Sequence, residues 1–234
     1  MQVCIELGGD LEGEALACIT QRFPFARTIE RAGDGASFER LNARLAALPD
    51  RSCPAVEVVS SSIHNVPAGT VVHVARLCPR LREVSCRALD SAELAAALEG
   101  LAPVAGTLEA LELTMQDYAQ MSVGIFAPVQ VEPGALLPAS EALGRLRSLR
   151  RLHIVWEHEP GPACLLAPAL PSLSSLSSLE VNGLPPGWLA TRLSPPLGVW
   201  PGSLREVTLY YPGMLGGLRA LPHLGGVTKL CLRG

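Results

Sequence analysis

The sequence lacks the positive charge and the long apolar runs that mark two large classes of protein. Its 19 Lys and Arg are outnumbered by 22 Asp and Glu, and no basic run occurs in a chain of net charge -3. Binding to a phosphate backbone needs clustered positive charge, so we expect no nucleic-acid partner. Apolar stretches such as ACLLAPALPSLSSLSSL are broken by proline and serine well short of the roughly 20 apolar residues of a membrane-spanning helix. We therefore expect no insertion into a membrane.

Signal-peptide features and clustered cysteines are missing as well. The first residues, MQVCIELGGDLEGE, are acidic rather than basic, which favours a cytoplasmic, reducing location. No C-x-x-C occurs, whereas zinc sites and disulfide frameworks need cysteines at set spacings. We predict free thiols that pack as small apolar side chains, with no metal site and no cofactor. The seven cysteines are Cys4, Cys18, Cys53, Cys78, Cys86, Cys164 and Cys231.

Catalytic motifs are also missing, and we predict that the protein is not an enzyme. No G-x-S-x-G, H-E-x-x-H or P-loop occurs. In WEHEPGPAC, His158 and Glu159 are adjacent and no second cysteine follows Cys164 at the spacing of a zinc deaminase. The segment AGDGASF lacks the third glycine of a phosphate-binding loop, and we interpret it as a turn. His153 has no acidic neighbour in the sequence, and we interpret it as a surface side chain.

What is present is an internal repeat, first visible in LCPRLREVSCR at residues 77–87. Six segments carry apolar residues or cysteine at the first, fourth and sixth positions of one frame. At 48% apolar composition, chance alone would fill all eighteen positions roughly twice in a million. The six sets are Leu81, Val84, Cys86; Leu108, Leu111, Leu113; Leu149, Leu152, Ile154; Leu176, Leu179, Val181; Leu204, Val207, Leu209; and Val227, Leu230, Leu232. Weaker sets precede them, at Val56, Val59, Ser61 and at Ala26, Ile29, Arg31.

The spacing of these sets resembles that of the leucine-rich repeat family. From Val56 onward, successive first positions are 25, 27, 41, 27, 28 and 23 residues apart, and the family repeats every 20 to 29 residues. The chain is most similar to the cysteine-containing repeats of F-box proteins and to ribonuclease inhibitor-like repeats. It departs from the family where an Asn or Cys is usual. Those positions hold Leu89, Gln116, Glu157, Leu184 and Pro212.

This resemblance implies an α/β solenoid formed by residues 1–234 as one domain of about seven to eight repeats. A curved parallel sheet would line its concave face, and helices followed by irregular segments would cover its convex face. Apolar residues at helical spacing predict helices at 11–23, 37–48, 68–77 and 91–101, with Asp90 and Glu93 as a capping box. After residue 160 the many prolines predict short helical turns and extended pieces.

The 41-residue spacing and the two chain ends carry further expectations. We interpret residues 116–145 as an inserted surface loop, with a degenerate extra strand as the alternative. Repeat arrays need polar caps over their terminal repeats. Because the chain begins near VCIEL and stops after KLCLRG, we expect either a fragment of a longer protein or end-to-end contact through uncapped terminal repeats.

Side chains alternate between faces along a strand, so the residues between the frame positions should face outward onto the concave side. We predict that they bind another protein, so the chain would act as a non-catalytic scaffold. The alternatives are a substrate-receptor subunit of an SCF-type ubiquitin ligase, although no F-box is recognisable, and an enzyme that uses the inserted loop. The predicted partner-binding residues are Glu83, Ser85, Arg87, Glu112, Thr114, Arg151, His153, Glu180, Asn182, Glu206, Thr208, Tyr210, Lys229 and Arg233.

Overall fold

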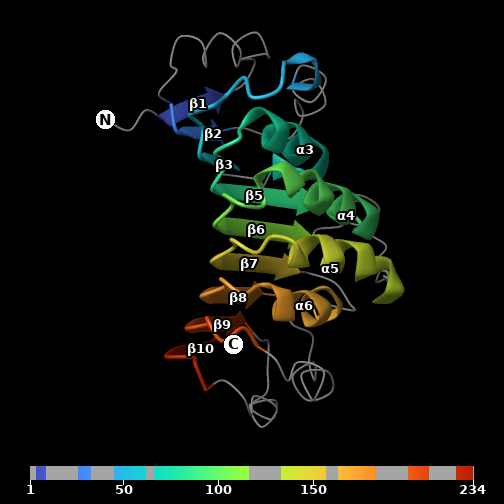
Figure 1. The fold of residues 1–234 in the computed structure, drawn as a ribbon, viewed down its shortest axis with the longest axis vertical. Coiled ribbons are helices and arrows are strands. Elements are labelled where there is room, and N and C mark those ends of the chain that lie inside the picture. Colours follow the sequence, from blue (N-terminus) through green and yellow to red (C-terminus); the bar gives the residue numbers. More distant parts are fainter. Residues whose placement is uncertain are drawn as a thin grey trace, which may run out of the picture.

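A parallel sheet whose strands follow one another in chain order dominates the computed structural model (Figure 1). The structure describes residues 4–8, 26–32, 45–61, 66–115, 133–156, 163–182, 200–210 and 225–233. Among these residues nine strands lie side by side in the order β1-β2-β3-β5-β6-β7-β8-β9-β10, and a short strand β4 pairs with β5 outside this order. The strands are β1 Cys4–Gly8, β2 Thr28–Ala32, β3 Val58–Ser61, β4 Val66–Pro67, β5 Glu83–Ala88, β6 Ala110–Met115, β7 Arg151–Trp156, β8 Ser178–Asn182, β9 Glu206–Tyr210 and β10 Lys229–Arg233.

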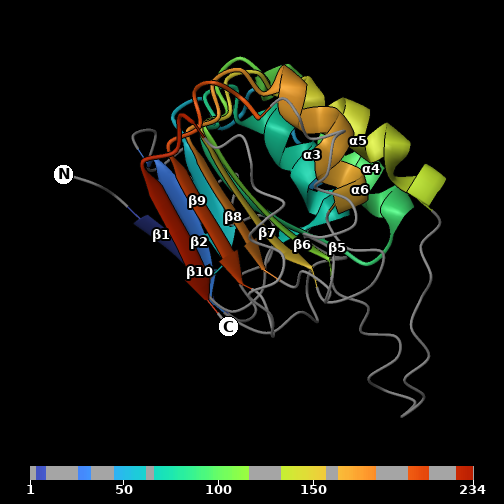
Figure 2. The ribbon, with the colours of Figure 1, turned by 90° about the horizontal axis from the view of Figure 1, so that it is seen from below.

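Helices cover one face of this sheet, as Figure 2 shows, and the predicted α/β class is confirmed. Parallel strands need a crossover between them, and here the described crossovers carry helices that lie on the same side. Helix α3 contacts α4, α4 contacts α5, and α5 contacts α6, so the helices form a second layer. The described helices are α3 Ala68–Leu77, α4 Ser91–Gly100, α5 Leu137–Gly144 and α6 Ala163–Ala169, with 3-10 turns η2 Ala102–Val104, η3 Pro133–Leu136 and η4 Leu170–Ser172.

The repeated apolar frame lies between the two layers. All fifteen side chains of its first five sets are at most 2% exposed. The fourth frame positions pair across the sheet, for example Val84 with Leu111 and Leu111 with Leu152. In the sixth set, Leu230 and Leu232 are 43% and 41% exposed, because β10 has β9 as its sole described neighbour in the sheet. The frame therefore marks the core side of each strand, and its last copy lies at the edge of the described sheet.

The predicted helices at 68–77 and 91–101 are confirmed by α3 and α4, and the predicted capping box is present. The Glu93 backbone N–H donates to Oδ1 of Asp90 at 2.7 Å. The Glu93 carboxylate accepts the N–H of Leu89 at 2.9 Å, one residue before the N-cap. Two N–H groups at the start of α4 are thereby satisfied. Of the other two predicted helices, 11–23 lies outside the described residues, and 37–48 is described only from residue 45, with 45–47 helical.

The predicted surface loop at 116–145 is wrong for its second half. Residues 133–144 form η3 and α5, which belong to the helical layer. Proline misled the prediction, because Pro138 lies in the first turn of α5, where a missing N–H costs nothing. Ala142 and Leu143 are at most 2% exposed, so this segment contributes to the core. Residues 116–132 lie outside the described residues.

Short helical turns were predicted after residue 160, and residues 163–172 confirm them. Helix α6 has seven residues, with Pro168 next to its last residue, and η4 follows directly. Proline removes a backbone donor, which fits the end of the helix at Ala169. Leu165 and Leu170 are at most 1% exposed, so even this short segment packs against the sheet.

A recurring backbone contact joins neighbouring repeats at the start of the strands. The Arg82 carbonyl accepts the N–H groups of Glu109 and Ala110 at 2.7 and 2.8 Å, and the Glu109 carbonyl accepts those of Arg150 and Arg151 at 2.8 and 2.9 Å. The same double contact recurs on both sides of these repeats, with carbonyls from Arg27 to Arg205. Each strand is therefore held in the same register against the one before it. We call this series the carbonyl ladder.

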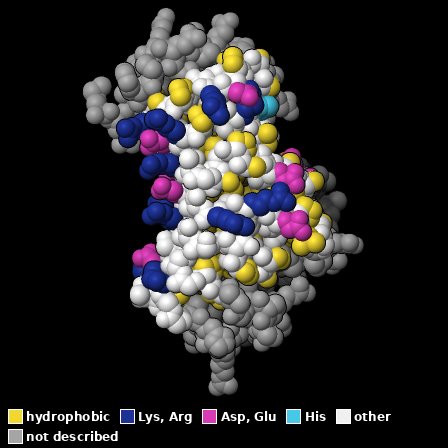
Figure 3. Space-filling model, viewed as in Figure 1, with side chains coloured by type: hydrophobic (Ala, Val, Ile, Leu, Met, Phe, Trp, Pro, Cys, Tyr) yellow, Lys and Arg dark blue, Asp and Glu magenta, His cyan; other side chains and the backbone are white. Residues whose placement is uncertain are grey.

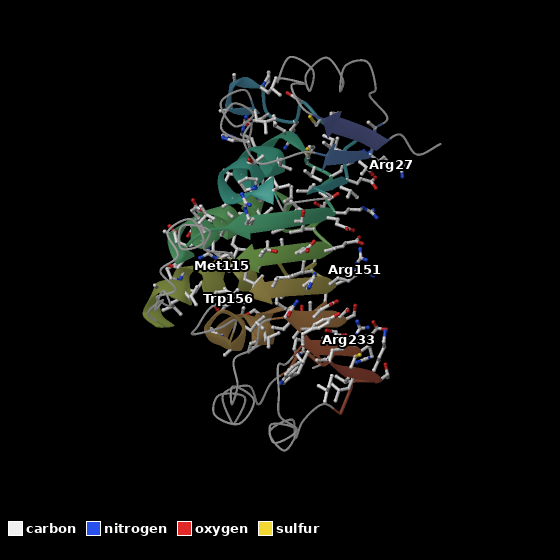
Figure 4. All side chains as sticks on the ribbon, turned by 180° about the vertical axis from the view of Figure 1, so that it is seen from behind. Arg27, Met115, Arg151, Trp156 and Arg233 are labelled. Atoms are coloured by element: carbon white, nitrogen blue, oxygen red, sulfur yellow. The ribbon has the colours of Figure 1, made fainter. Side chains whose placement is uncertain are left out.

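Side chains strengthen this edge of the sheet. Ion pairs join Arg27 to Glu57 at 3.9 Å and Arg82 to Glu109 at 3.8 Å, so opposite charges alternate along the start of the strands (Figure 3). Hydroxyls placed just before the frame leucines donate to the previous repeat, as Ser203 does to the Leu176 carbonyl at 2.7 Å. In Figure 4, Arg27 and Arg151 lie at this edge, whereas Met115 and Trp156 lie at the opposite ends of their strands.

The described cysteines are free. Cys53, Cys78 and Cys86 are buried, and Cys231 is partly exposed. Burial, with a smaller contribution from the negative charge of Glu93, raises the pKa of Cys86 from 9.0 to about 12. A hydrogen bond between the two thiols, together with burial, raises the pKa of Cys78 next to Cys53. These three thiols are therefore core side chains in their protonated form at neutral pH.

Candidate functional site

The sheet face opposite α3, α4, α5 and α6 is covered by no described helix, and we call it the open face (Figure 2). Strand register places all fourteen predicted partner-binding residues on it, in three rows across the strands. The first row holds Glu83, Arg151, Glu206 and Lys229. The second row holds Ser85, Glu112, His153, Glu180 and Thr208. The third row holds Arg87, Thr114, Asn182, Tyr210 and Arg233.

Exposure differs within these rows. Arg151 and Lys229 have side chains that are 66% and 64% exposed. Ser85 and Thr114, by contrast, are 4% and 6% exposed, although their strand positions predicted outward-facing side chains. Both are shorter than the charged residues beside them in their rows, so their neighbours cover them. The long side chains of the open face are therefore available to a partner, whereas these two hydroxyls lie at its base.

The imidazole of His153 lies between two carboxylates. Its Nδ1 is 3.5 Å from Oε1 of Glu112 on β6, and its Nε2 is 3.8 Å from Oε1 of Glu180 on β8. The interpretation of His153 as a surface side chain without acidic neighbours is therefore wrong. Its acidic neighbours come from the adjacent strands, 41 residues before it and 27 after it in the sequence. Sequence neighbours alone could not reveal them, whereas alignment of the repeats would have.

Other charges on the open face are paired. Arg151 donates to Oε2 of Glu83 at 2.9 Å, and Lys229 lies 3.6 Å from Glu206. Arg233 donates to the Tyr210 hydroxyl at 3.1 Å and lies over the same ring at 5.4 Å from its centroid. Exposed pairs of this kind contribute little to stability, so they are free to exchange partners when another molecule binds.

A hollow with a volume of about 260 Å³ lies over the central strands of the open face. Its base includes Val84, Leu111 and Leu152 of the apolar frame, and its rim is polar. Sequence reasoning missed Ser60 and Ser178, because a lone serine in a strand gives no functional signal. The polar residues that line the hollow are Ser60, Glu83, Ser85, Glu112, Arg151, His153, Ser178 and Glu180.

The chemistry of this hollow favours binding. Among the described residues no group of three His, Cys, Asp or Glu side chains could hold a metal ion. The Ser85 hydroxyl has no hydrogen-bond partner in the described part of the chain, so it is not paired with His153 as a nucleophile would be with its base. Three carboxylates, one guanidinium and one imidazole instead offer charged and hydrogen-bonding contacts to a ligand.

Comparison with known proteins adds no family. No protein-family model matches the chain, and no curated protein matches it. Within the described ranges no helix has both the length and the apolar character that crossing a bilayer requires.

Proposed function

We propose that the chain is a leucine-rich repeat protein that binds a partner protein on its open face and catalyses no reaction. The face would be the concave side of a solenoid, and the partner would lie across several strands. The cytoplasm is the proposed location. This proposal keeps the sequence resemblance and joins it to the arrangement of side chains on the sheet.

One observation carries the proposal: three rows of polar and charged side chains run across the open face, uncovered by any described helix. Surfaces of this kind in repeat proteins serve as extended binding sites. The recurring frame, the carbonyl ladder and the near-constant spacing of the sets support the repeat architecture. The exposed and weakly paired side chains support binding, because a partner can replace their contacts at little cost.

A pull-down from cell extract with identification by mass spectrometry tests the proposal. The bait variant carries Arg151→Glu and Tyr210→Ala on the open face. Binding energy concentrates in a few arginine and aromatic residues, so capture of the partner should fall at least tenfold. Exposed strand positions change stability by only about 0.5 kcal/mol, so the fold should be kept.

The matched control carries Glu99→Lys and Glu141→Lys, two exposed positions on α4 and α5. Glu93 is unsuitable because it caps α4. Loss of capture by the helix variant, with the open-face variant unaffected, would refute the proposal. Capture of a Skp-type adaptor would favour the ubiquitin-ligase alternative.

A further inference from the structure

The hollow on the open face contains two carboxylates with capacity for a further ligand. Arg151 is already bonded to Glu83 at 2.9 Å. Glu112 and Glu180 face the His153 imidazole at 3.5 and 3.8 Å, both longer than an ordinary N–H···O hydrogen bond. An ionised carboxylate has about four lone-pair sites, so each can accept further donors. With a neutral imidazole, three carboxylates stand against one guanidinium, and the hollow has a net negative charge.

An unpartnered hydroxyl lies in the same hollow. Ser85 is 4% exposed, lines the hollow and stands opposite Glu112 in the strand register. Its Oγ has no hydrogen-bond partner among the described residues. Buried polar side-chain atoms nearly always have a partner, and leaving one unsatisfied costs free energy. This hydroxyl is therefore a second, independent indication that a donor from another molecule occupies the site.

We propose that the hollow binds the guanidinium of an arginine side chain from the partner protein. This inference rests on the proposed function and names the chemistry of its central contact. A guanidinium carries five N–H donors in a flat fork, which suits several acceptors spread around one site. It would lie between Glu112 and Glu180 and present a donor toward Ser85. The volume of about 260 Å³ has room for one long side chain, and the negative charge selects a cation.

Binding of two short peptides tests this inference directly. The probes are an acetylated Gly-Arg-Gly amide and the same peptide with citrulline, which keeps the shape of arginine and removes its charge. Each is titrated into the isotope-labelled full chain and followed by NMR. The arginine peptide should shift the backbone amides of β5, β6, β7 and β8 around the hollow. The citrulline peptide should bind at least tenfold more weakly, because neither carboxylate then meets a positive charge.

Variants locate the contact. Glu112→Gln with Glu180→Gln should weaken the arginine peptide at least tenfold, whereas Glu99→Gln with Glu141→Gln makes the same charge change on the helices and should leave its affinity unaltered. Ser85→Ala should weaken the peptide severalfold without lowering the free energy of unfolding, since it removes an unsatisfied group. Circular dichroism checks that each variant is folded. The comparison of the two peptides on the unmodified chain decides the matter even where a variant fails to fold.

Equal affinity for the two peptides, or shifts confined to the helical layer, would overturn the arginine site. The proposed function has a separate outcome. If Arg151→Glu with Tyr210→Ala abolishes partner capture while Glu112→Gln with Glu180→Gln leaves it intact, the open face binds the partner but the arginine site is wrong. If the peptides behave as expected while open-face substitutions leave capture intact, the arginine site stands and the proposed function fails.

Discussion

Arg151 on β7 reaches across β6 to donate a 2.9 Å hydrogen bond to Glu83 on β5. The residue between them in the row is Ala110, whose small side chain leaves the path open. A longer side chain at this position would stand between the two charges. The pair therefore depends on three consecutive strands, and it forms one wall of the hollow.

This ion pair should contribute little to stability. The two side chains are 66% and 45% exposed, and exposed pairs contribute about 0.2–1 kcal/mol. A double-mutant cycle with Glu83→Gln and Arg151→Gln, measured by urea unfolding, should give a coupling energy in that range. The coupling should shrink in high salt, which screens exposed charges. A coupling of several kcal/mol would show that the pair is far less hydrated than its exposure indicates.

Equivalent leucines of the frame should differ in their contribution to stability. Leu111 on β6 is 2% exposed, and Leu111→Ala should lower the free energy of unfolding by about 2–5 kcal/mol. Leu230 occupies the same frame position on β10 but is 43% exposed, so Leu230→Ala should cost well under half as much. Urea unfolding of both variants checks this. Equal losses would mean that β10 is more deeply buried in solution.

The capping box of α4 should be measurable by single substitutions. Asp90→Ala removes the acceptor for the Glu93 N–H and should lower the free energy of unfolding by about 1 kcal/mol. Glu99→Ala, an exposed change in the same helix, serves as the control and should stay within about 0.5 kcal/mol. If both variants unfold at the same urea concentration as the unmodified chain, the cap contributes nothing.

Stability should fall at alkaline pH, in part because of Cys86. Its pKa is about 12 in the folded chain against an ordinary value of 9.0. Above pH 9 the unfolded chain therefore binds fewer protons than the folded one, so the free energy of unfolding decreases as the pH rises toward 12. Cys86→Val removes this contribution. Between pH 8 and pH 10, the variant should lose about 1 kcal/mol less than the unmodified chain, as measured by urea unfolding. Parallel curves would contradict the raised pKa.

The strands were predictable from the sequence, but one helix was not. Three apolar positions per repeat define a short strand and its core side, because burial requires apolar side chains at a period of two. Helix α5 escaped prediction because glycine and prolines near its start suggested a loop. Pro138 occupies the one turn of a helix that tolerates proline, so composition alone misjudged the segment.

The open face was predictable as a set of residues, whereas its contacts were not. Strand alternation selected Glu112, His153 and Glu180 as outward residues, and register brought them into one row. Nothing in the local sequence of Ser85 indicated that its hydroxyl would be buried without a partner. Such a feature depends on the lengths of neighbouring side chains from other repeats.

The carbonyl ladder has a consequence for engineering. Arg150 and Arg151 bind the Glu109 carbonyl just as Glu109 and Ala110 bind that of Arg82, although 41 residues rather than 27 separate the frame positions. The alignment of the strands is therefore independent of the length of the chain between them. A foreign domain could be grafted between residues 116 and 132 without shifting a single strand. The segment would then display its cargo while the sheet remained a fixed chassis.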